Sequence, residues 1–195
     1  MCRKCRSLER HRIFRTIFNT IRTPEFLKYN CLQFSSDPSI ALGWFAQATR
    51  SMFGGANHLD IQDIAYPAES FDVVVCNHIL EHVPEYRSAI LEVARITKAT
   101  GFLFLSFPNP YQRKVTEDWG YPRPEQHNHY RLFGRDVEGV FQTLLPDHHV
   151  LALEAEDPVT GTKDIAYILT RSARWRNHIM AKHDKTTLVV DAEIH

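Results

Sequence analysis

Two runs of apolar residues without any alternation stand out along the chain. Residues 71–76 (FDVVVC) and residues 102–107 (FLFLSF) each predict a strand that is covered on both faces. A shorter run, residues 31–34 (CLQF), ends at a Ser-Ser-Asp-Pro turn and predicts a third strand. Fully apolar strands of this kind are typical of a parallel sheet that is sandwiched between helices.

Helical spacing of apolar residues surrounds these strands. A helix that begins near Ser7 and ends before Pro24 is indicated by apolar residues at i, i+3, i+4 and i+7, namely Phe14, Ile17, Phe18 and Ile21. We expect three further helices, at residues 39–50, 84–98 and 135–145. The N-terminal helix would present one apolar face to the rest of the domain.

The last regular part of the pattern predicts a hairpin. Residues 150–154 and 165–170 are apolar segments on either side of a turn at residues 157–161. Nearer the middle of the chain, residues 58–61 fit one further short strand. Strands and helices therefore alternate and end in a hairpin. The sequence predicts an α/β fold with a doubly wound, mostly parallel sheet, helices on both faces and an antiparallel C-terminal hairpin.

Composition narrows the class of protein. With 195 residues and 44% hydrophobic residues, the chain is long enough to bury one core. The formal net charge of zero provides no overall field that would attract nucleic acid or an anionic membrane. No apolar run approaches the roughly 18 residues of a membrane span, and the N-terminus is polar. We therefore expect a cytoplasmic protein without nucleic-acid or membrane partners.

Charge is nevertheless distributed unevenly. Residues 1–30 hold eight basic and two acidic side chains, whereas residues 58–92 hold seven acidic side chains and one arginine. The acidic segment could dock the basic one or bind a cation, and both could equally be solvated faces of separate elements.

The middle of the chain carries a long motif. Residues 59–85 read LDIQDIAYPAESFDVVVCNHILEHVPE, and residues 90–108 read ILEVARITKATGFLFLSFP. In order and spacing these segments resemble the class I S-adenosylmethionine-dependent methyltransferases, in the type 11-like group. Weaker likeness extends to residues 2–12 and to residues 116–137. The resemblance implies a Rossmann-like methyltransferase fold, S-adenosylmethionine as cofactor and a methyl acceptor that is a small molecule.

The resemblance also implies roles for particular residues. Asp60 would accept a hydrogen bond from the adenine amino group, which suits an acceptor-only carboxylate, and the Ile61 N–H would meet a ring nitrogen. Asn77 and His78 would border the methionine arm. Ligands of doubly wound sheets bind outside the carboxyl ends of the strands, so these segments should meet there. Asp60 could instead cap a turn, and His82 fits a packed or solvent-facing histidine.

The first motif departs from the family. The glycine-rich turn after the first strand, where missing side chains let the backbone approach the cofactor, is replaced by residues 34–40 (FSSDPSI). Ser35, Ser36 and Asp37 could still offer polar contacts to the cofactor. No acid for the ribose hydroxyls can be named. The sequence is thus compatible with a weakly binding methyltransferase and with a catalytically inactive methyltransferase-like binding or scaffold module.

The acceptor side would be formed by the long insertion at residues 109–134. It is rich in polar and aromatic residues and follows the strand that ends at Phe107, where a lid over the acceptor would lie, although a solvent-covered loop explains it too. Histidine titrates near neutral pH, so His78 and His129 are the candidate catalytic bases. A nucleic-acid site on the basic N-terminal helix is a weaker third hypothesis, because the helix's apolar spacing favours packing.

We divide the chain into residues 1–29 (a Cys-x-x-Cys segment and the helix), residues 30–171 (the methyltransferase-like domain) and a C-terminal tail, residues 172–195. Cys2 and Cys5 have the spacing of metal ligands, but zinc requires four ligands and His11 is the only further one nearby. We therefore expect no bound metal. The acceptor and the oligomeric state are not indicated by any motif.

Overall fold

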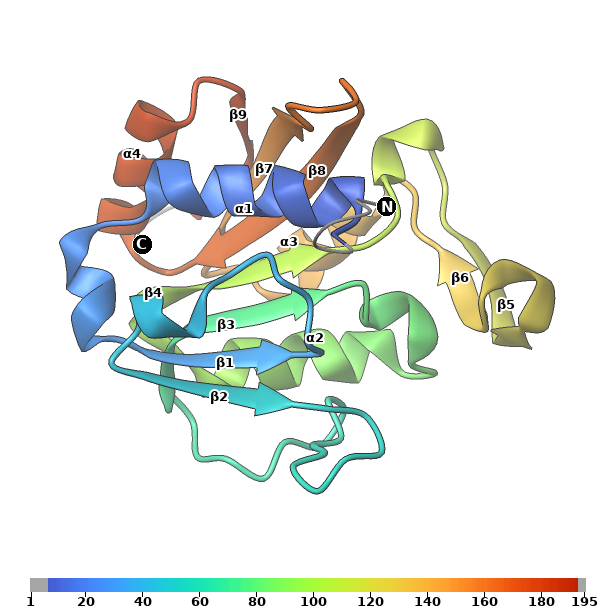
Figure 1. Cartoon of the computed structure of the whole chain (residues 1–195). Coiled ribbons are helices and arrows are strands. Elements are labelled where there is room, and N and C mark those ends of the chain that lie inside the picture. Colours follow the sequence, from blue (N-terminus) through green and yellow to red (C-terminus); the bar gives the residue numbers. More distant parts are fainter. Residues whose placement is uncertain (1–6, 193–195) are drawn as a thin grey trace.

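A computed structural model describes residues 7–192, and a seven-stranded sheet forms its centre (Figure 1). In chain order the strands are β1 (Asn30–Phe34), β2 (Gln47–Ser51), β3 (Phe71–Asn77), β4 (Thr97–Ser106), β7 (His149–Glu156), β8 (Lys163–Thr170) and β9 (Thr186–Val190). Their order in the sheet is β2-β1-β3-β4-β8-β7-β9. The chain moves outward from β1 to β2 and returns to β3 on the other side of β1, so strand order reverses between β1 and β3.

The sheet has the predicted mixture of directions. Strands β1 to β4 pair in parallel, and β4 pairs antiparallel with β8. Strands β7 and β8 form the predicted antiparallel hairpin, and β9 pairs antiparallel with β7. The two apolar runs lie at the centre as β3 and β4, which confirms the fold class expected from the sequence.

Helices cover both faces (Figure 1). They are α1 (Glu9–Ile21), α2 (Tyr86–Ile96), α3 (Val137–Leu144) and α4 (Ala173–Lys182). Side chains of β3 alternate between two buried clusters: Val73 and Val75 pack with α1 and α4, whereas Val74 and Cys76 pack with α2 and α3. This double burial explains why the strand is apolar at every position. None of the helices within residues 7–192 has the length and apolar character needed to cross a membrane.

Two local predictions were wrong. Residues 39–50 do not form a helix: a short 3-10 turn at Leu42–Trp44 is followed by β2, which gains its hydrogen bonds by pairing with β1. Residues 58–61 form no strand: residues 58–60 have no regular structure, and a turn begins at Ile61. In both places tertiary contacts override the local preference of the sequence.

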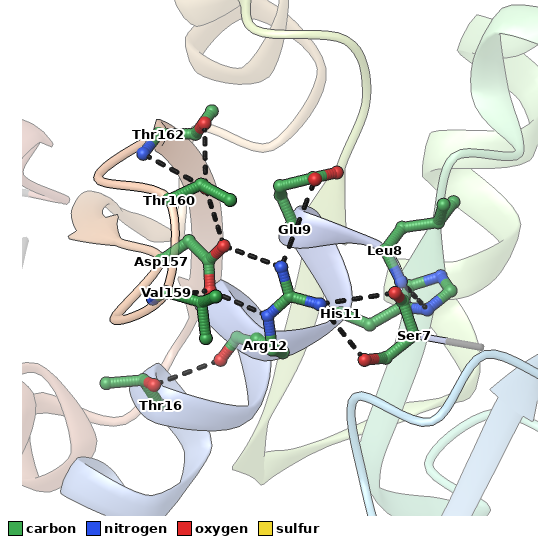
Figure 2. A network of polar contacts seen from close by, with 10 residues as sticks. All are labelled: Ser7, Leu8, Glu9, His11, Arg12, Thr16, Asp157, Val159, Thr160 and Thr162. Atoms are coloured by element: carbon green, nitrogen blue, oxygen red, sulfur yellow. Dashed lines mark hydrogen bonds and ion pairs between the residues drawn. The ribbon is translucent and has the colours of Figure 1, made fainter. Parts of the chain in front are cut away.

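A small second sheet lies beside the main one. Strands β5 (Glu117–Arg123) and β6 (His129–Leu132) pair antiparallel within the segment expected to be an insertion (Figure 1). The N-terminal helix α1 buries the predicted apolar face, and its basic residue Arg12 reaches the turn between β7 and β8, as Figure 2 shows. The Cys-x-x-Cys pair, Cys2 and Cys5, lies outside the described residues.

Candidate functional site

A cavity of about 320 Å³ opens where the carboxyl ends of β1, β2 and β3 meet. This is the side of the sheet, and the point of reversed strand order, at which doubly wound folds bind ligands. Its volume lies at the lower end of the range for small-molecule sites, about 300–1,000 Å³. The lining residues come from four segments of the chain: Phe34, Ser35, Ser51, Phe53, His58, Leu59, Asp60, Ile61, Gln62, Ile79, His82, Val83, Pro84 and Tyr130.

The loop that carries Asp60 is held in place by its own turn and by helix α2. Asp60 Oδ1 accepts hydrogen bonds from the backbone N–H of Gln62 (2.9 Å) and from the Gln62 side-chain amide (3.1 Å). These hydrogen bonds lower the pKa of Asp60, so the carboxylate is charged at neutral pH. The loop thereby presents an exposed, ionised acceptor to the cavity.

The Glu92–Arg95 pair on α2 anchors the far end of the same loop. Arg95 donates to the carbonyl oxygens of Tyr66 (2.8 Å) and Ile64 (2.9 Å), and Glu92 accepts from the Ile64 N–H (2.8 Å). The two side chains also form an ion pair with each other (2.7 Å). This pair therefore positions the loop, a role that helical spacing alone did not indicate.

The turn after β1 replaces glycine with a strained serine. Ser35 has a φ of 69°, in the left-handed region that glycine adopts without penalty, and its N–H donates to the Ser51 carbonyl oxygen (2.9 Å). Ser35 lines the cavity, whereas Ser36 and Asp37 are absent from its lining. The backbone thus keeps the conformation of a glycine turn while a hydroxymethyl group takes up space beside the cavity.

Asn77 and Asp37 belong to a buried polar network. The Asn77 amide donates to Ser39 Oγ (3.0 Å) and to Asp37 Oδ2 (3.3 Å), and its oxygen accepts from Ser106 Oγ (3.0 Å). This network joins the ends of β3 and β4 to the turn after β1. Neither residue lines the cavity.

Neither His78 nor His129 lines the cavity. His78, with a φ of 53°, lies beside Phe14 of α1 (ring centroids 6.2 Å apart) and lines a separate hollow with residues of that helix. His129 is buried on β6 with its ring 4.6 Å from that of His82. Burial lowers the pKa of His129, so its imidazole is neutral at pH 7.

Arg131 explains how β6 reaches the cavity. Its guanidinium is almost fully buried and donates to the carbonyl oxygens of Leu80 (3.1 Å), Val83 (2.5 Å) and Pro84 (2.8 Å), and to Asp118 (2.8 Å). One side chain thus fixes the segment after β3 against both strands of the small sheet. No local signal distinguishes this arginine from the others in the sequence.

Of the residues singled out from the sequence, the structure brings Ser35, Asp60 and Ile61 to one cavity. Sequence reasoning missed Ser51, at the end of β2, together with the roles of His82 and Tyr130 in the wall. Ser51 Oγ accepts the Leu59 N–H (3.0 Å), which joins β2 to the Asp60 loop. His82 belongs to the motif at residues 59–85, where the sequence indicated a packed or solvent-facing histidine and no role in a site.

Comparison with known proteins agrees with this architecture. A family model described as a methyltransferase domain matches residues 37–143, more than half of the chain. The chain belongs to the methyltransferase domain family.

Individual relatives match either over a short segment or at low sequence identity. The ubiquinone biosynthesis O-methyltransferase of Hahella chejuensis (strain KCTC 2396) is 52% identical over 42 residues, which is 22% of this chain and 18% of that protein. A putative methyltransferase from Bacillus halodurans C-125 superposes with a TM-score of 0.51 at 12% identity, over 80% of this chain and 95% of that one.

A third similar protein is Burkholderia thailandensis 1,6-didemethyltoxoflavin-N1-methyltransferase, solved with bound 1,6-didemethyltoxoflavin and S-adenosylhomocysteine. Its TM-score is 0.53 at 11% identity, over 80% of this chain and 76% of that one. At such identities the two structures share a fold with this chain.

Proposed function

We propose that this protein is an S-adenosylmethionine-dependent methyltransferase that acts on a small-molecule acceptor, with the cofactor held in the cavity at the ends of β1, β2 and β3. The observation that supports this most is Asp60, an ionised acceptor on the cavity wall at the point of reversed strand order. Membership of the methyltransferase domain family supports the reaction class.

The chemistry of the cavity fits such a cofactor. Leu59, Ile61 and Phe53 supply apolar walls for a flat adenine ring, and Asp60 supplies the acceptor for its amino group. Ser51 already accepts one hydrogen bond, so its hydroxyl proton can be donated to a ribose oxygen. Ser35 would face the methionine arm, where its side chain reduces the space that a glycine would leave.

When bound, the cofactor supplies an electrophilic methyl group, which an acceptor oxygen or nitrogen attacks in line while the methyl–sulfur bond breaks. This chain's contribution is alignment and exclusion of water. Tyr130 and His82 form the wall on the side of the small sheet, and Arg131 holds that sheet in place. The acceptor would therefore lie between the cofactor site and β6, under residues 109–134.

Titration calorimetry with S-adenosylmethionine and S-adenosylhomocysteine tests the proposal. A hydrogen bond to a charged acceptor contributes about 1.5–3 kcal/mol, so Asp60→Ala should weaken binding about ten- to a hundredfold. Asp63→Ala, an exposed acid of the same loop outside the cavity lining, is the matched control and should change the Kd by less than about twofold. Equal Kd values for Asp60→Ala and the unaltered protein would contradict the proposed adenine site.

Binding without turnover would favour the other hypothesis. If the protein binds S-adenosylhomocysteine through Asp60 but methylates none of a panel of phenols, catechols and amines, the inactive binding module becomes the better account. The glycine-free turn at Ser35 is the observation behind that alternative.

A further inference from the structure

Three potential metal ligands converge beside the cavity. Glu81 and His82 follow β3 in a short 3-10 turn (Leu80–His82), and His129 lies on β6. One ligand atom from each residue lies within 4.8 Å of the other two. The two imidazole rings are close to perpendicular, at 85°. Residues far apart in the sequence thus present two imidazoles and one carboxylate to a common point.

The carboxylate of Glu81 is the unusual member of this group. Glu81 has no solvent exposure, and neither of its oxygens has a hydrogen-bond partner among residues 7–192. His78 Nδ1 lies 3.2 Å from Oε1, at ion-pair distance. His129 Nδ1 is also buried and has no hydrogen-bond partner among the residues that the structure describes. Buried carboxylates are ordinarily paired, hydrogen-bonded or bound to a metal, because burial of an unpaired charge is costly.

We propose that Glu81, His82 and His129 bind a divalent transition-metal ion, with zinc as the best fit. Two histidines and one glutamate form a ligand set that proteins use for zinc sites with an open fourth position. Zinc bonds of about 2.0–2.2 Å place tetrahedral ligand atoms about 3.4 Å apart. The ligand atoms lie within 4.8 Å of one another, so zinc binding requires them to draw closer, and the exposed His82 is the ligand with the most room to move.

Neighbouring residues hold the three ligands in position, which favours a preorganised site over a chance cluster. His78 lies beside Glu81 at 3.2 Å, in the outer position that partners of metal ligands commonly take. Arg131 fixes the backbone of Leu80 and Val83, on both sides of the turn, to the strand that carries His129. The distance between the two halves of the site is therefore set by a buried guanidinium.

The location suggests what the open position would bind. His82 lines the cavity as well as belonging to the cluster, so the metal would lie at the wall where the acceptor is expected. This part of the inference rests on the proposed function. A hydroxyl oxygen of the acceptor would complete the coordination and lose its proton to solvent, because the metal lowers its pKa. The oxygen would then bond to the methyl group while the methyl–sulfur bond breaks, leaving its electron pair on the sulfur of S-adenosylhomocysteine. Hydroxylated acceptors, such as phenols or catechols, are the indicated class.

The test measures metal and needs no cofactor. Cys2→Ser and Cys5→Ser are introduced into the full chain to remove the two cysteine candidates. This protein is stripped with a chelator and titrated with Zn²⁺ against a competing dye. We expect one Zn²⁺ per chain, and at least about a hundredfold weaker binding after His82→Ala or His129→Gln. His58→Ala, an exposed histidine elsewhere on the cavity, is the matched control and should bind Zn²⁺ unchanged.

Cobalt provides an independent readout. Co²⁺ in the same protein should give the intense visible bands of four-coordinate nitrogen and oxygen ligation, without thiolate charge transfer, and His82→Ala should abolish them. The exposed position of His82 keeps this variant folded, which circular dichroism checks. Zinc binding that is lost with Cys2 and Cys5, or unchanged in His82→Ala, would overturn the site. If zinc binds as expected but calorimetry finds no cofactor binding, only the proposed function and the acceptor assignment fail.

Discussion

The ion pair between Arg12 and Asp157 offers the most direct test of how the N-terminal helix is attached. Arg12 Nε donates to Asp157 Oδ1 (2.7 Å) and Nη2 donates to Oδ2 (2.6 Å), a bidentate arrangement seen in Figure 2. Thr160 donates a further hydrogen bond to the carboxylate (2.6 Å). The pair joins α1 to the turn between β7 and β8.

Burial decides how strong this coupling should be. Exposed ion pairs contribute about 0.2–1 kcal/mol. Asp157 is fully buried and the Arg12 side chain is only 19% exposed, so solvent screens this pair much less. With two charge-assisted hydrogen bonds, we expect a coupling free energy of about 2–3 kcal/mol, the upper end of the range measured for contacting residues.

A double-mutant cycle measures that value. Urea unfolding is followed for the unaltered protein, Arg12→Ala, Asp157→Ala and the double variant. Each single change should cost about 3 kcal/mol, because it leaves the partner charge uncompensated, and the double variant should cost clearly less than the sum. A coupling below about 0.5 kcal/mol would refute the reasoning and reduce the pair to a surface contact.

The same pair predicts a pH dependence. The Arg12 hydrogen bonds lower the pKa of Asp157 below its ordinary value of about 3.9. Its stabilising contribution is therefore complete above about pH 4 and is lost as pH falls further towards the lowered folded-state value. The stability difference between the unaltered protein and Asp157→Ala should be constant from about pH 5 to 8 and shrink below about pH 4. A difference that changes between pH 5 and 8 would point to another group.

Four further substitutions test local packing and positioning. Gly101→Ala places a Cβ 2.1 Å from the Asp72 carbonyl oxygen and should lower the free energy of unfolding in urea by about 2–3 kcal/mol. Gly139→Ala, in open space on α3, should be neutral or stabilising by up to about 1 kcal/mol, and equal effects of the two changes would contradict the packing argument. Ser35→Gly relieves a positive φ and should stabilise the protein by about 0.5 kcal/mol and tighten cofactor binding in calorimetry; weaker binding would show that the hydroxyl contacts the ligand. Arg131→Lys keeps the charge but loses hydrogen bonds to backbone carbonyl oxygens, so it should lower the free energy of unfolding by about 3 kcal/mol. A decrease below about 1 kcal/mol in urea unfolding would show that Arg131 does not hold the small sheet in place.

The centre of the sheet was predictable because its signal is local. Residues 71–76 and 102–107 are apolar at every position, and burial on both faces requires that pattern. The edge strand Gln47–Ser51 carries no such pattern, because pairing with β1 and not its own side chains makes it extended. Strand β9 lies in the segment that the sequence left without an assignment.

The candidate site was predictable only where it follows the motif. Asp60 and Ile61 line the cavity, as expected from the position of their loop in the family motif, ahead of the strand at residues 71–77. The placement of His82 beside His129 depends on the buried Arg131, which ties β6 to the turn after β3. Such a long-range contact has no periodicity or spacing that a single sequence reveals.

The location of the cofactor is the central claim, and a crystal of the full chain soaked in millimolar S-adenosylhomocysteine tests it most directly. The account predicts the adenine ring against Ile61, with its amino group within hydrogen-bond distance of Asp60, and the ligand passing Ser35 at the ends of β1 and β3. A structure in which residues 34–40 fill this space, or in which the ligand binds elsewhere, would contradict it.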